Sequence, residues 1–373
     1  MIHRELESVL RQKLDLKKVI VVYGARQVGK SSLLQMIFGG NPNTLWLNGE
    51  DSETRNLMEN LSSQNLSLSF SAYKTLIIDE AQNVLNIGRC LKIIHDNMPD
   101  LQIIATGSSS FDLANKVNEP LTGRKLEYRL FPLSFAEMVA HHGLFEEKRL
   151  LNQRLIYGYY PDVVCNSENS RELLNNLASS YLYKDVLIWE NLKKSDKIHK
   201  LLQAIALQVG SMVSYTELGN LCGLDNKTVE KYIALLEQAF IIFRLPSFSK
   251  NMRNELKFSK KIYFYDNGIR NAVIGNFSDV GLRNDVGALW ENFAIAERIK
   301  RSNYQQNFSN HWFWRTKLQS EIDLIEETDG RLKSFEFKWN PKRKAVVPIS
   351  FTQAYPETEF CVVSPENIEA FLL

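Results

Sequence analysis

Eight consecutive residues near the amino terminus have the types and spacing of a phosphate-binding turn. Residues 24–31 read Gly-Ala-Arg-Gln-Val-Gly-Lys-Ser and fit the pattern GxxxxGK[ST]. The apolar run VIVVY precedes them and the helical pattern SLLQMIF follows, so they occupy a strand-to-helix turn. Backbone N–H groups and the positive end of a helix bind phosphate at such a turn. The nucleotide-binding residues predicted from this pattern are Gly24, Ala25, Arg26, Gln27, Val28, Gly29, Lys30, Ser31 and Ser32.

The chemistry expected at this turn is the binding and hydrolysis of ATP with Mg²⁺. Lys30 would reach the β- and γ-phosphates, and Ser31 would bind Mg²⁺. In the later run TLIIDE, Asp79 would hold Mg²⁺, and Glu80 would orient or deprotonate the attacking water. The next apolar run, LQIIATG, leads into hydroxyl residues, and one of them, with Ser108 as the candidate, would sense the γ-phosphate. A second carboxylate aimed at water favours an ATPase over a protein that only binds nucleotide.

A second set of residues near the carboxyl end could also carry chemistry. Asp323 lies in EIDLI, Glu336 and Lys338 lie in FEFKW, and Glu291 lies on a preceding helical segment. Residues two apart in a strand share a face, so Glu336 and Lys338 are expected to point together toward Asp323. The pattern resembles the PD-(D/E)xK core of restriction-endonuclease-like domains. This resemblance implies carboxylates that bind Mg²⁺ and a lysine that positions or activates water at a phosphodiester. An active nuclease and a binding or regulatory remnant both stay open.

Alternating apolar runs and helical patterns must position these residues. Strands are expected in VIVVYG, TLWLNG, TLIIDE and LQIIATG, separated by helices, which predicts a parallel sheet covered on both faces. Near the carboxyl end, the long helical pattern GALWENFAIAERIKR precedes the strand patterns HWFWRT, SEIDLIEE and LKSFEFKW. Asp329 and Gly330 are expected to form a hairpin turn between the last two. The predicted fold class is α/β.

The middle of the chain has helix-turn-helix spacing. One helix opens at residues 214–218, Gly223 turns the chain, and Asn226 is expected to cap a second helix, KTVEKYIALLEQ. The strand-like run IIFRLPSF follows where a wing would lie, and a basic stretch with one acid, Glu255, begins within it: Arg244, Lys250, Arg253, Lys257, Lys260 and Lys261. DNA contact is therefore predicted at Lys227, Lys231, Lys250, Arg253 and Lys257. The alternative is a packing or lid module that contacts no DNA.

The order of these motifs resembles known ATPases. The polar residues that end LQIIATG resemble the arrangement in AAA-type P-loop ATPases, in which a polar residue ends the strand next to the DE strand. A closer resemblance is to bacterial and archaeal ATPases in which LTGR (121–124) leads into PLSFAE (132–137), followed by YGYYPDV, SYLYKDV and a carboxyl-terminal domain of unknown function. The resemblance covers nearly the whole chain. It implies that Arg124 acts as an arginine finger, in cis or from a neighbouring subunit, and the second case requires a homo-oligomer.

Composition narrows the class of protein. The chain has 373 residues, of which 44% are hydrophobic and 24% charged, a mixture typical of globular proteins and not of disordered ones. Its four cysteines form no CxxC pair, so neither a zinc ribbon nor a disulfide framework is indicated. No apolar run reaches the roughly 18 residues that cross a bilayer, so no membrane partner is expected. The charged amino terminus reads as an amphipathic helix, and the expected location is cytoplasmic.

Four domains are predicted. They are a P-loop AAA-type ATPase domain (1–145), a helical lid or connector (146–205), a winged-helix domain (206–261) and a restriction-endonuclease-like domain (262–373). The leading functional prediction is a nucleotide-controlled switch or motor that binds ATP and Mg²⁺ and acts on DNA. The alternatives are a nucleotide-regulated Mg²⁺-dependent DNA nuclease and a protein-binding regulatory module with weak ATPase activity.

Overall fold

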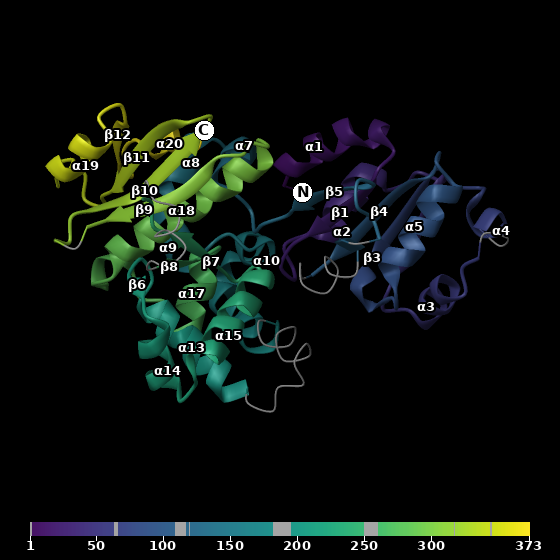
Figure 1. Ribbon diagram of the computed structural model, residues 1–373, viewed down its shortest axis with the longest axis horizontal. Helices are drawn as coiled ribbons and strands as arrows, with labels where there is room; N and C mark the ends of the chain where they lie inside the picture. Colours follow the sequence, from purple (N-terminus) through teal and green to yellow (C-terminus); the bar gives the residue numbers. More distant parts are fainter. Residues whose placement is uncertain are drawn as a thin grey trace. The chain divides into compact units, whose positions relative to one another are not determined.

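The chain folds into two compact units. The computed structural model describes residues 2–62, 66–108, 117–118, 120–181, 195–249, 260–316, 318–343 and 345–373. One unit contains residues 3–132 and 238–240, and the other contains residues 133–237 and 241–373 (Figure 1). Residues 133–145, which we expected in the ATPase domain, therefore lie in the second unit.

The first unit is built on a five-stranded sheet in which all neighbouring strands are parallel. The strand order is β2-β3-β4-β1-β5, with bounds β1 (Val19–Tyr23), β2 (Thr44–Asn48), β3 (Thr75–Asp79), β4 (Gln102–Gly107) and β5 (Lys125–Arg129). The four predicted strands are present. Every residue of β1 and β4 is buried, as expected for central strands covered on both faces. The fifth strand, β5, was not predicted, because its sequence KLEYR is mostly polar and lies at the sheet edge.

Short helices connect these strands. Their bounds are α1 (Glu5–Lys13), η1 (Leu14–Leu16), α2 (Lys30–Phe38), α3 (Ser52–Glu59), α4 (Leu66–Phe70), η2 (Ala81–Asn83) and α5 (Ile87–Asn97). Helix α1 is the predicted amphipathic helix, and it buries Leu6 and Leu10. Helix α2 begins at Lys30, directly after the phosphate-binding turn, as the sequence predicts.

The second unit begins with helices. Their bounds are α7 (Phe135–His142), α8 (Leu144–Arg149), α9 (Leu151–Tyr157), α10 (Pro161–Cys165), η3 (Ser167–Asn169), α11 (Ser170–Asn176) and the π-helical η4 (Leu177–Tyr181). A capping box starts α7, since the Ser134 hydroxyl accepts from Glu137 N and the Glu137 carboxylate accepts from Ser134 N. Pro161 occupies the first turn of α10, where its missing N–H costs no helical bond. Most of the SYLYKDV motif lies outside the described residues.

A three-helix, three-stranded part follows, with α13 (Ser195–Leu207), β6 (Met212–Val213), α14 (Tyr215–Cys222), α15 (Asn226–Gln238), β7 (Ile242–Pro246) and β8 (Lys260–Phe264). The strands form an antiparallel sheet in the order β6-β8-β7. Helix α15 buries one apolar face, which consists of Val229, Tyr232, Ile233, Leu235 and Leu236. Two expectations were wrong. Asp225, and not Asn226, caps α15, because its carboxylate accepts from Thr228 N at 3.0 Å. The run KIYFYD, with which the predicted carboxyl-terminal domain (262–373) was expected to begin, pairs with β7 and β6 and is not part of the carboxyl-terminal sheet.

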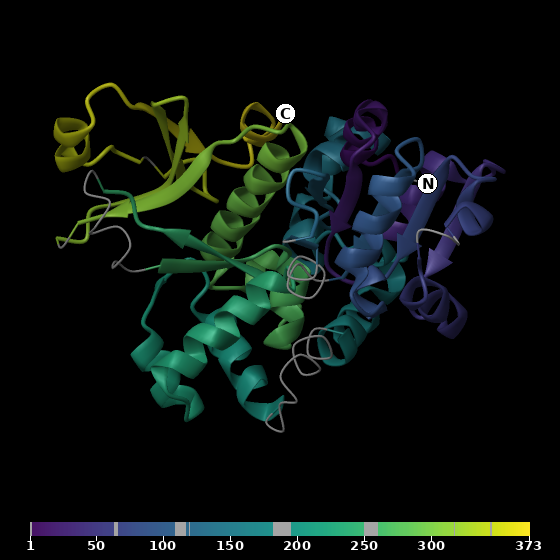
Figure 2. The same ribbon diagram turned by 45° about the vertical axis from the view of Figure 1, so that its right-hand side comes forward.

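The carboxyl-terminal part combines a long helix with a four-stranded sheet (Figure 2). Its elements are α17 (Asn267–Val273), η5 (Val280–Leu282), α18 (Val286–Tyr304), β9 (Asn310–Arg315), β10 (Glu321–Thr328), β11 (Arg331–Phe337), α19 (Ile349–Ala354), β12 (Glu359–Val363) and α20 (Ile368–Leu372). The strand order is β12-β11-β10-β9, with β11 and β12 parallel and the other pairs antiparallel. Asp329 and Gly330 form the predicted hairpin turn, both with positive φ.

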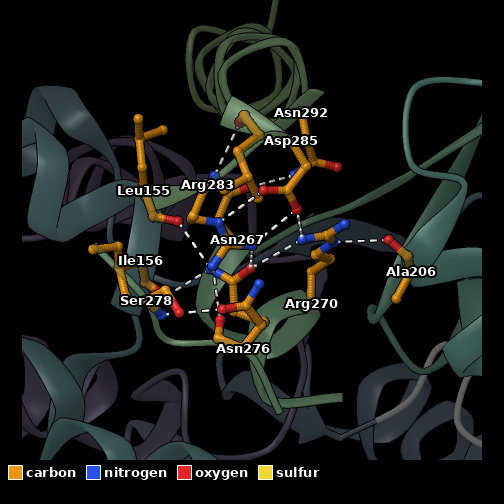
Figure 3. Close-up of polar contacts among 12 residues, drawn as sticks. Leu155, Ile156, Ala206, Asn267, Arg270, Asn276, Ser278, Arg283, Asp285 and Asn292 are labelled. Atoms are coloured by element: carbon orange, nitrogen blue, oxygen red, sulfur yellow. Dashed lines mark hydrogen bonds and ion pairs between the residues drawn. The ribbon is translucent and has the colours of Figure 1, made fainter. Parts of the chain in front are cut away.

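A buried polar network holds the start of α18 in place (Figure 3). Asp285 accepts from Arg270 at 2.6 Å and from Arg283 at 2.8 Å. Asn271 donates to the carbonyls of Leu155 and Ile156 on α9, and Arg270 donates to Ala206 O on α13. Through these bonds the helices α9, α13 and α17 are connected to Asp285, the residue that precedes α18. The network comprises Asn267, Arg270, Asn271, Arg283, Asp285 and Asn292.

Candidate functional site

The backbone of the phosphate-binding turn can adopt its path only with glycine at two positions. A Cβ on Gly24 would lie 2.2 Å from Leu130 O, which no side chain could occupy. Gly29 has φ +94°, a left-handed conformation that favours glycine. Gly24 N also donates to Gly107 O at 3.3 Å, joining the turn to the end of β4. The glycines of the motif are therefore explained by the local geometry.

The polar side chains at the start of α2 face the end of β3. Lys30 is buried, and its ammonium donates to Gly24 O at 2.9 Å and to Ala25 O at 3.0 Å. Ser31 Oγ donates to Asp79 Oδ2 at 2.6 Å. The two predicted Mg²⁺ ligands are thus direct neighbours, although 48 positions separate them in sequence. Of the remaining residues of the predicted turn, Gln27 and Ser32 are exposed and Arg26 is half-buried.

Glu80 and Ser108 are brought together by a residue that sequence reasoning missed. Gln82 donates from Nε2 to Glu80 Oε2 at 2.6 Å and to Ser108 Oγ at 3.3 Å. Thr106 Oγ1 donates to Asp79 Oδ1 and accepts from Glu80 N at 3.1 Å. Glu80 itself has φ +48°, a left-handed backbone that turns the chain sharply at the strand end. A polar residue two positions after the DE pair was the available signal for Gln82.

Arg4 supports the turn from outside the motif. Its guanidinium is buried and donates to Val28 O at 2.7 Å and to Phe131 O at 2.7 Å. Two segments that lie 103 positions apart, from Val28 to Phe131, are thereby fastened beside the turn. A lone arginine before an amphipathic helix gave no signal of this role in the sequence.

Arg124 does not lie at this site. It directly precedes β5, whose first residue, Lys125, pairs with Val19 at the amino end of β1. The phosphate-binding turn follows Tyr23 at the other end of the same strand, roughly 15 Å away at the usual rise per residue. Arg124 Nε instead donates to Asp96 Oδ1 at 2.8 Å. The expected role of Arg124 in cis is therefore wrong for this arrangement, and a role in trans stays a prediction.

These residues fit a Mg²⁺-bound nucleotide. The turn has the glycines that a phosphate cradle needs, and Lys30 would contact the phosphates. Ser31 and Asp79 would hold the metal, and Glu80 lies beside them with Gln82 and Ser108. Together with the sheet order, they define the first unit as a P-loop ATPase domain of the α/β class.

Comparison with known proteins agrees with this class. Residues 16–139 match a family described as AAA domain, residues 148–280 match a domain of unknown function (DUF8612), and residues 286–370 match a domain of unknown function (DUF4143). The chain is 27% identical over 293 residues to an uncharacterized protein of Haemophilus influenzae, covering 72% of this chain and 73% of the relative. It is 25% identical over 346 residues to a protein of Methanocaldococcus jannaschii, covering 87% of this chain and 74% of that one.

One solved structure shares the fold over much of the chain. The Walker-type ATPase PABY2304 of Pyrococcus abyssi superposes with a TM-score of 0.53 and 16% identity, covering 73% of this chain and 96% of that one. At this identity the likeness concerns the fold alone.

The carboxyl-terminal residues predicted for nuclease chemistry also lie together. Lys338 Nζ donates to Glu336 Oε1 at 2.6 Å, and Phe337 N donates to Asp323 Oδ2 at 2.9 Å. Burial, with the charges of Glu291 and Glu336, raises the pKa of Asp323 well above its usual range. Two residues of β8 that were not predicted here, Lys261 and Tyr263, complete the group. The carboxylate–lysine cluster comprises Lys261, Tyr263, Glu291, Glu321, Asp323, Glu336 and Lys338.

This cluster does not fit the Mg²⁺ that the PD-(D/E)xK resemblance implies. The Lys261 ammonium lies 3.0 Å from Glu291 Oε1 and 2.5 Å from Glu321 Oε1. Glu291 also accepts from the Tyr263 hydroxyl at 2.6 Å. Throughout the described part of the chain, no group of three or more His, Cys, Asp or Glu side chains is arranged so that it could hold a metal ion. The carboxylates converge, but they are bonded to the protein's own donors.

The predicted DNA-contact residues are only partly described. Lys227 and Lys231 are exposed on α15, whereas Lys250, Arg253 and Lys257 lie outside the described residues. Two members of the basic stretch are engaged within the protein, because Arg244 pairs with Glu237 and Lys261 is buried in the carboxylate–lysine cluster. None of the helices in the described ranges is long and apolar enough to span a bilayer.

Proposed function

We propose that this protein is a Mg²⁺-dependent ATPase that uses its nucleotide state as a switch or motor. The observation that carries the proposal is the contact of Ser31 with Asp79, directly beside the chain of Glu80, Gln82 and Ser108. A site that only binds Mg²⁺ and nucleotide needs the pair of Ser31 and Asp79. Glu80 adds a second carboxylate whose orientation is fixed by Gln82, which is what the activation of a water molecule requires.

Each residue has a distinct task in this proposal. The metal, when bound, neutralises phosphate charge and orients the triphosphate. Lys30 lies where its ammonium can exchange the carbonyls of Gly24 and Ala25 for phosphate oxygens. Glu80 accepts the proton of the attacking water or orients it, and Ser108 lies where the state of the γ-phosphate can be read.

Turnover measurements on two variants test the proposal. Lys30→Ala should lower kcat/KM for ATP about 100-fold or more, because the charge that faces the phosphates is lost. Glu80→Gln should lower kcat by a similar factor while a fluorescent ATP analogue still binds. Lys92→Ala and Glu53→Gln remove exposed groups of the same types from the same unit and should leave turnover unchanged. Wild-type turnover in either site variant would remove the site assignment.

A role for Arg124 in a neighbouring subunit is part of the same proposal. Its distance from the turn of its own chain leaves only a second copy as the recipient of the guanidinium. Size-exclusion chromatography with light scattering, with and without a non-hydrolysable ATP analogue, should show a homo-oligomer in the presence of the analogue. A monomer under both conditions would end this role.

DNA is the partner class that we propose for the second unit. The order α13-β6-α14-α15-β7-β8, with its antiparallel sheet, supports a winged helix, and Lys227 and Lys231 lie exposed on the second helix of the turn. Retardation of duplex DNA at about 50 mM salt, lost by about 200 mM and weakened in Lys227→Ala/Lys231→Ala, is expected from counterion release. Absence of retardation at low salt would favour the protein-binding regulatory module instead.

A further inference from the structure

Lys261 is a buried lysine in an unusual position. Its side chain is 1% exposed, and its ammonium bonds to Glu291 on α18 and to Glu321 at the start of β10. A buried ammonium must be paired, because its desolvation is otherwise very costly. Burial lowers the pKa of Lys261, but the charges of Glu291, Asp323 and Glu321 raise it more, so the amine stays protonated.

Side chains alternate between the two faces of β8, and this alternation places the Lys261 ammonium beside Glu291. Lys261 and Tyr263 lie two residues apart on one face, and both bond to Glu291 Oε1. The preceding residue, Lys260, has its ammonium 5.8 Å from the centre of the Tyr215 ring. A strand of the three-stranded sheet therefore places a cation among acids that belong to the carboxyl-terminal helix and hairpin.

Three of the four carboxyl groups in this region are paired with cations of the protein itself. Arg315 pairs with Glu321 at 3.1 Å, and Lys338 pairs with Glu336 at 2.6 Å. The fourth carboxyl, Asp323, has a raised pKa and accepts from the backbone N–H of Phe337. Three cations thus pair with three of the four carboxyl groups, and the fourth is bonded to the backbone: Lys261, Arg315 and Lys338 pair with Glu291, Glu321 and Glu336, and Asp323 accepts from Phe337 N.

We infer that the Lys261 ammonium is the resident cation of the carboxylate–lysine cluster and takes the place of a divalent metal ion there. The residues of a metal-dependent phosphodiester site are assembled, but Lys261 of β8 supplies the counter-charge of Glu291 and shares Glu321 with Arg315. The intact protein consequently does not bind a divalent ion at Asp323 and does not cleave DNA there.

Manganese binding tests this inference independently of ATP turnover. In a calorimetric titration, the wild-type protein and the Asp323→Asn variant should bind Mn²⁺ equally, because neither has a Mn²⁺ site at position 323. Lys261→Met should gain one Mn²⁺ site that a further Asp323→Asn change removes. Bound Mn²⁺ should also raise the thermal midpoint of Lys261→Met by about 5 °C. The matched control is Lys260→Met, which removes the adjacent lysine and should gain no site.

Two outcomes would overturn the inference. One is wild-type Mn²⁺ binding, or plasmid cleavage with Mg²⁺ or Mn²⁺, that disappears in Asp323→Asn. The other is a folded Lys261→Met protein that gains no Mn²⁺ site. Should Lys261→Met fail to fold, the comparison of wild type with Asp323→Asn still decides, and Lys261→Arg, which keeps the charge, should match the wild type.

Discussion

The two units use the same kinds of polar side chain in opposite ways. In the first unit, Lys30 bonds to two carbonyls of its own turn, and Ser31 bonds to Asp79 near the surface. These bonds can be exchanged for bonds to a ligand. In the second unit, Lys261 and Arg270 are held by carboxylates in the interior. These ion pairs stabilise the fold, and no ligand would take the place of either partner if it were removed. Residue type and convergence alone therefore do not separate a binding site from an internal ion pair.

The largest effect that would sharpen this contrast is expected at Lys261. Lys261→Met should lower the free energy of unfolding of the second unit by about 3 kcal/mol, since the half-buried Glu291 loses its ammonium partner while Glu321 keeps Arg315. Urea unfolding followed by tryptophan fluorescence can report this, because Trp290, Trp312, Trp314 and Trp339 all lie in this unit. Lys30→Ala should change the stability of its own unit by far less. Equal losses in the two variants would contradict the contrast.

A smaller effect is expected at Asp285. Burial raises the pKa of its carboxyl, but hydrogen bonds from Arg283 and Arg270 lower it more, from 3.8 to about 2. The stabilisation is therefore complete above pH 3.8 and is lost as the pH falls through about 2. Asp285→Asn should cost about 2 kcal/mol or more at pH 7.

Urea unfolding at pH 7, 4 and 3 checks this prediction. The stability difference between wild type and Asp285→Asn should begin to close only below pH 4. Asp279→Asn, which removes a carboxylate for which the described structure shows no ion pair, is the matched control. A difference that is the same at all three pH values would show that the charge of Asp285 contributes nothing.

The smallest of the three effects is expected at Gln82. Gln82→Ala should lower kcat for ATP about tenfold with KM unchanged, because Glu80 loses the amide that orients it. Gln102→Ala removes another buried glutamine of the first unit, whose amide donates to Lys18 O and Ile103 O, and it should leave kcat unchanged. Similar losses of kcat in both variants would indicate a general effect of packing.

Much of the first unit could be predicted because its signals are local. The apolar runs that become β1, β3 and β4 end directly in the residues that carry the chemistry, so one pattern fixes both strand and site. Parallel order then brings Ser31 to Asp79 without any further information. The strand β5 was missed because an edge strand needs little apolar sequence. Gln82 was missed because its partner Ser108 follows β4, a distant segment of the sequence.

The second unit was harder to predict because its contacts join distant segments. Lys261 belongs to a basic stretch and therefore reads as a solvent-facing residue. Its acids come from α18 and β10, which lie 30 and 60 positions further along the chain. The D…ExK pattern led us to expect Asp323, Glu336 and Lys338 near one another, as the structure has them. It did not indicate that Lys261 on β8 would pair with Glu291 and Glu321 beside them. The helices of the middle region were predictable because their apolar residues lie within single segments, although the cap of α15 was placed one residue too late.

The bond from Arg4 has a practical consequence for work on this protein. Its guanidinium reaches the carbonyl of Val28, next to the glycine that opens α2. A protein shortened to start at residue 5 would keep every residue of the ATP motif and still leave that carbonyl without its partner. Weak nucleotide affinity measured on such a version would report on the truncation and not on the residues of the motif.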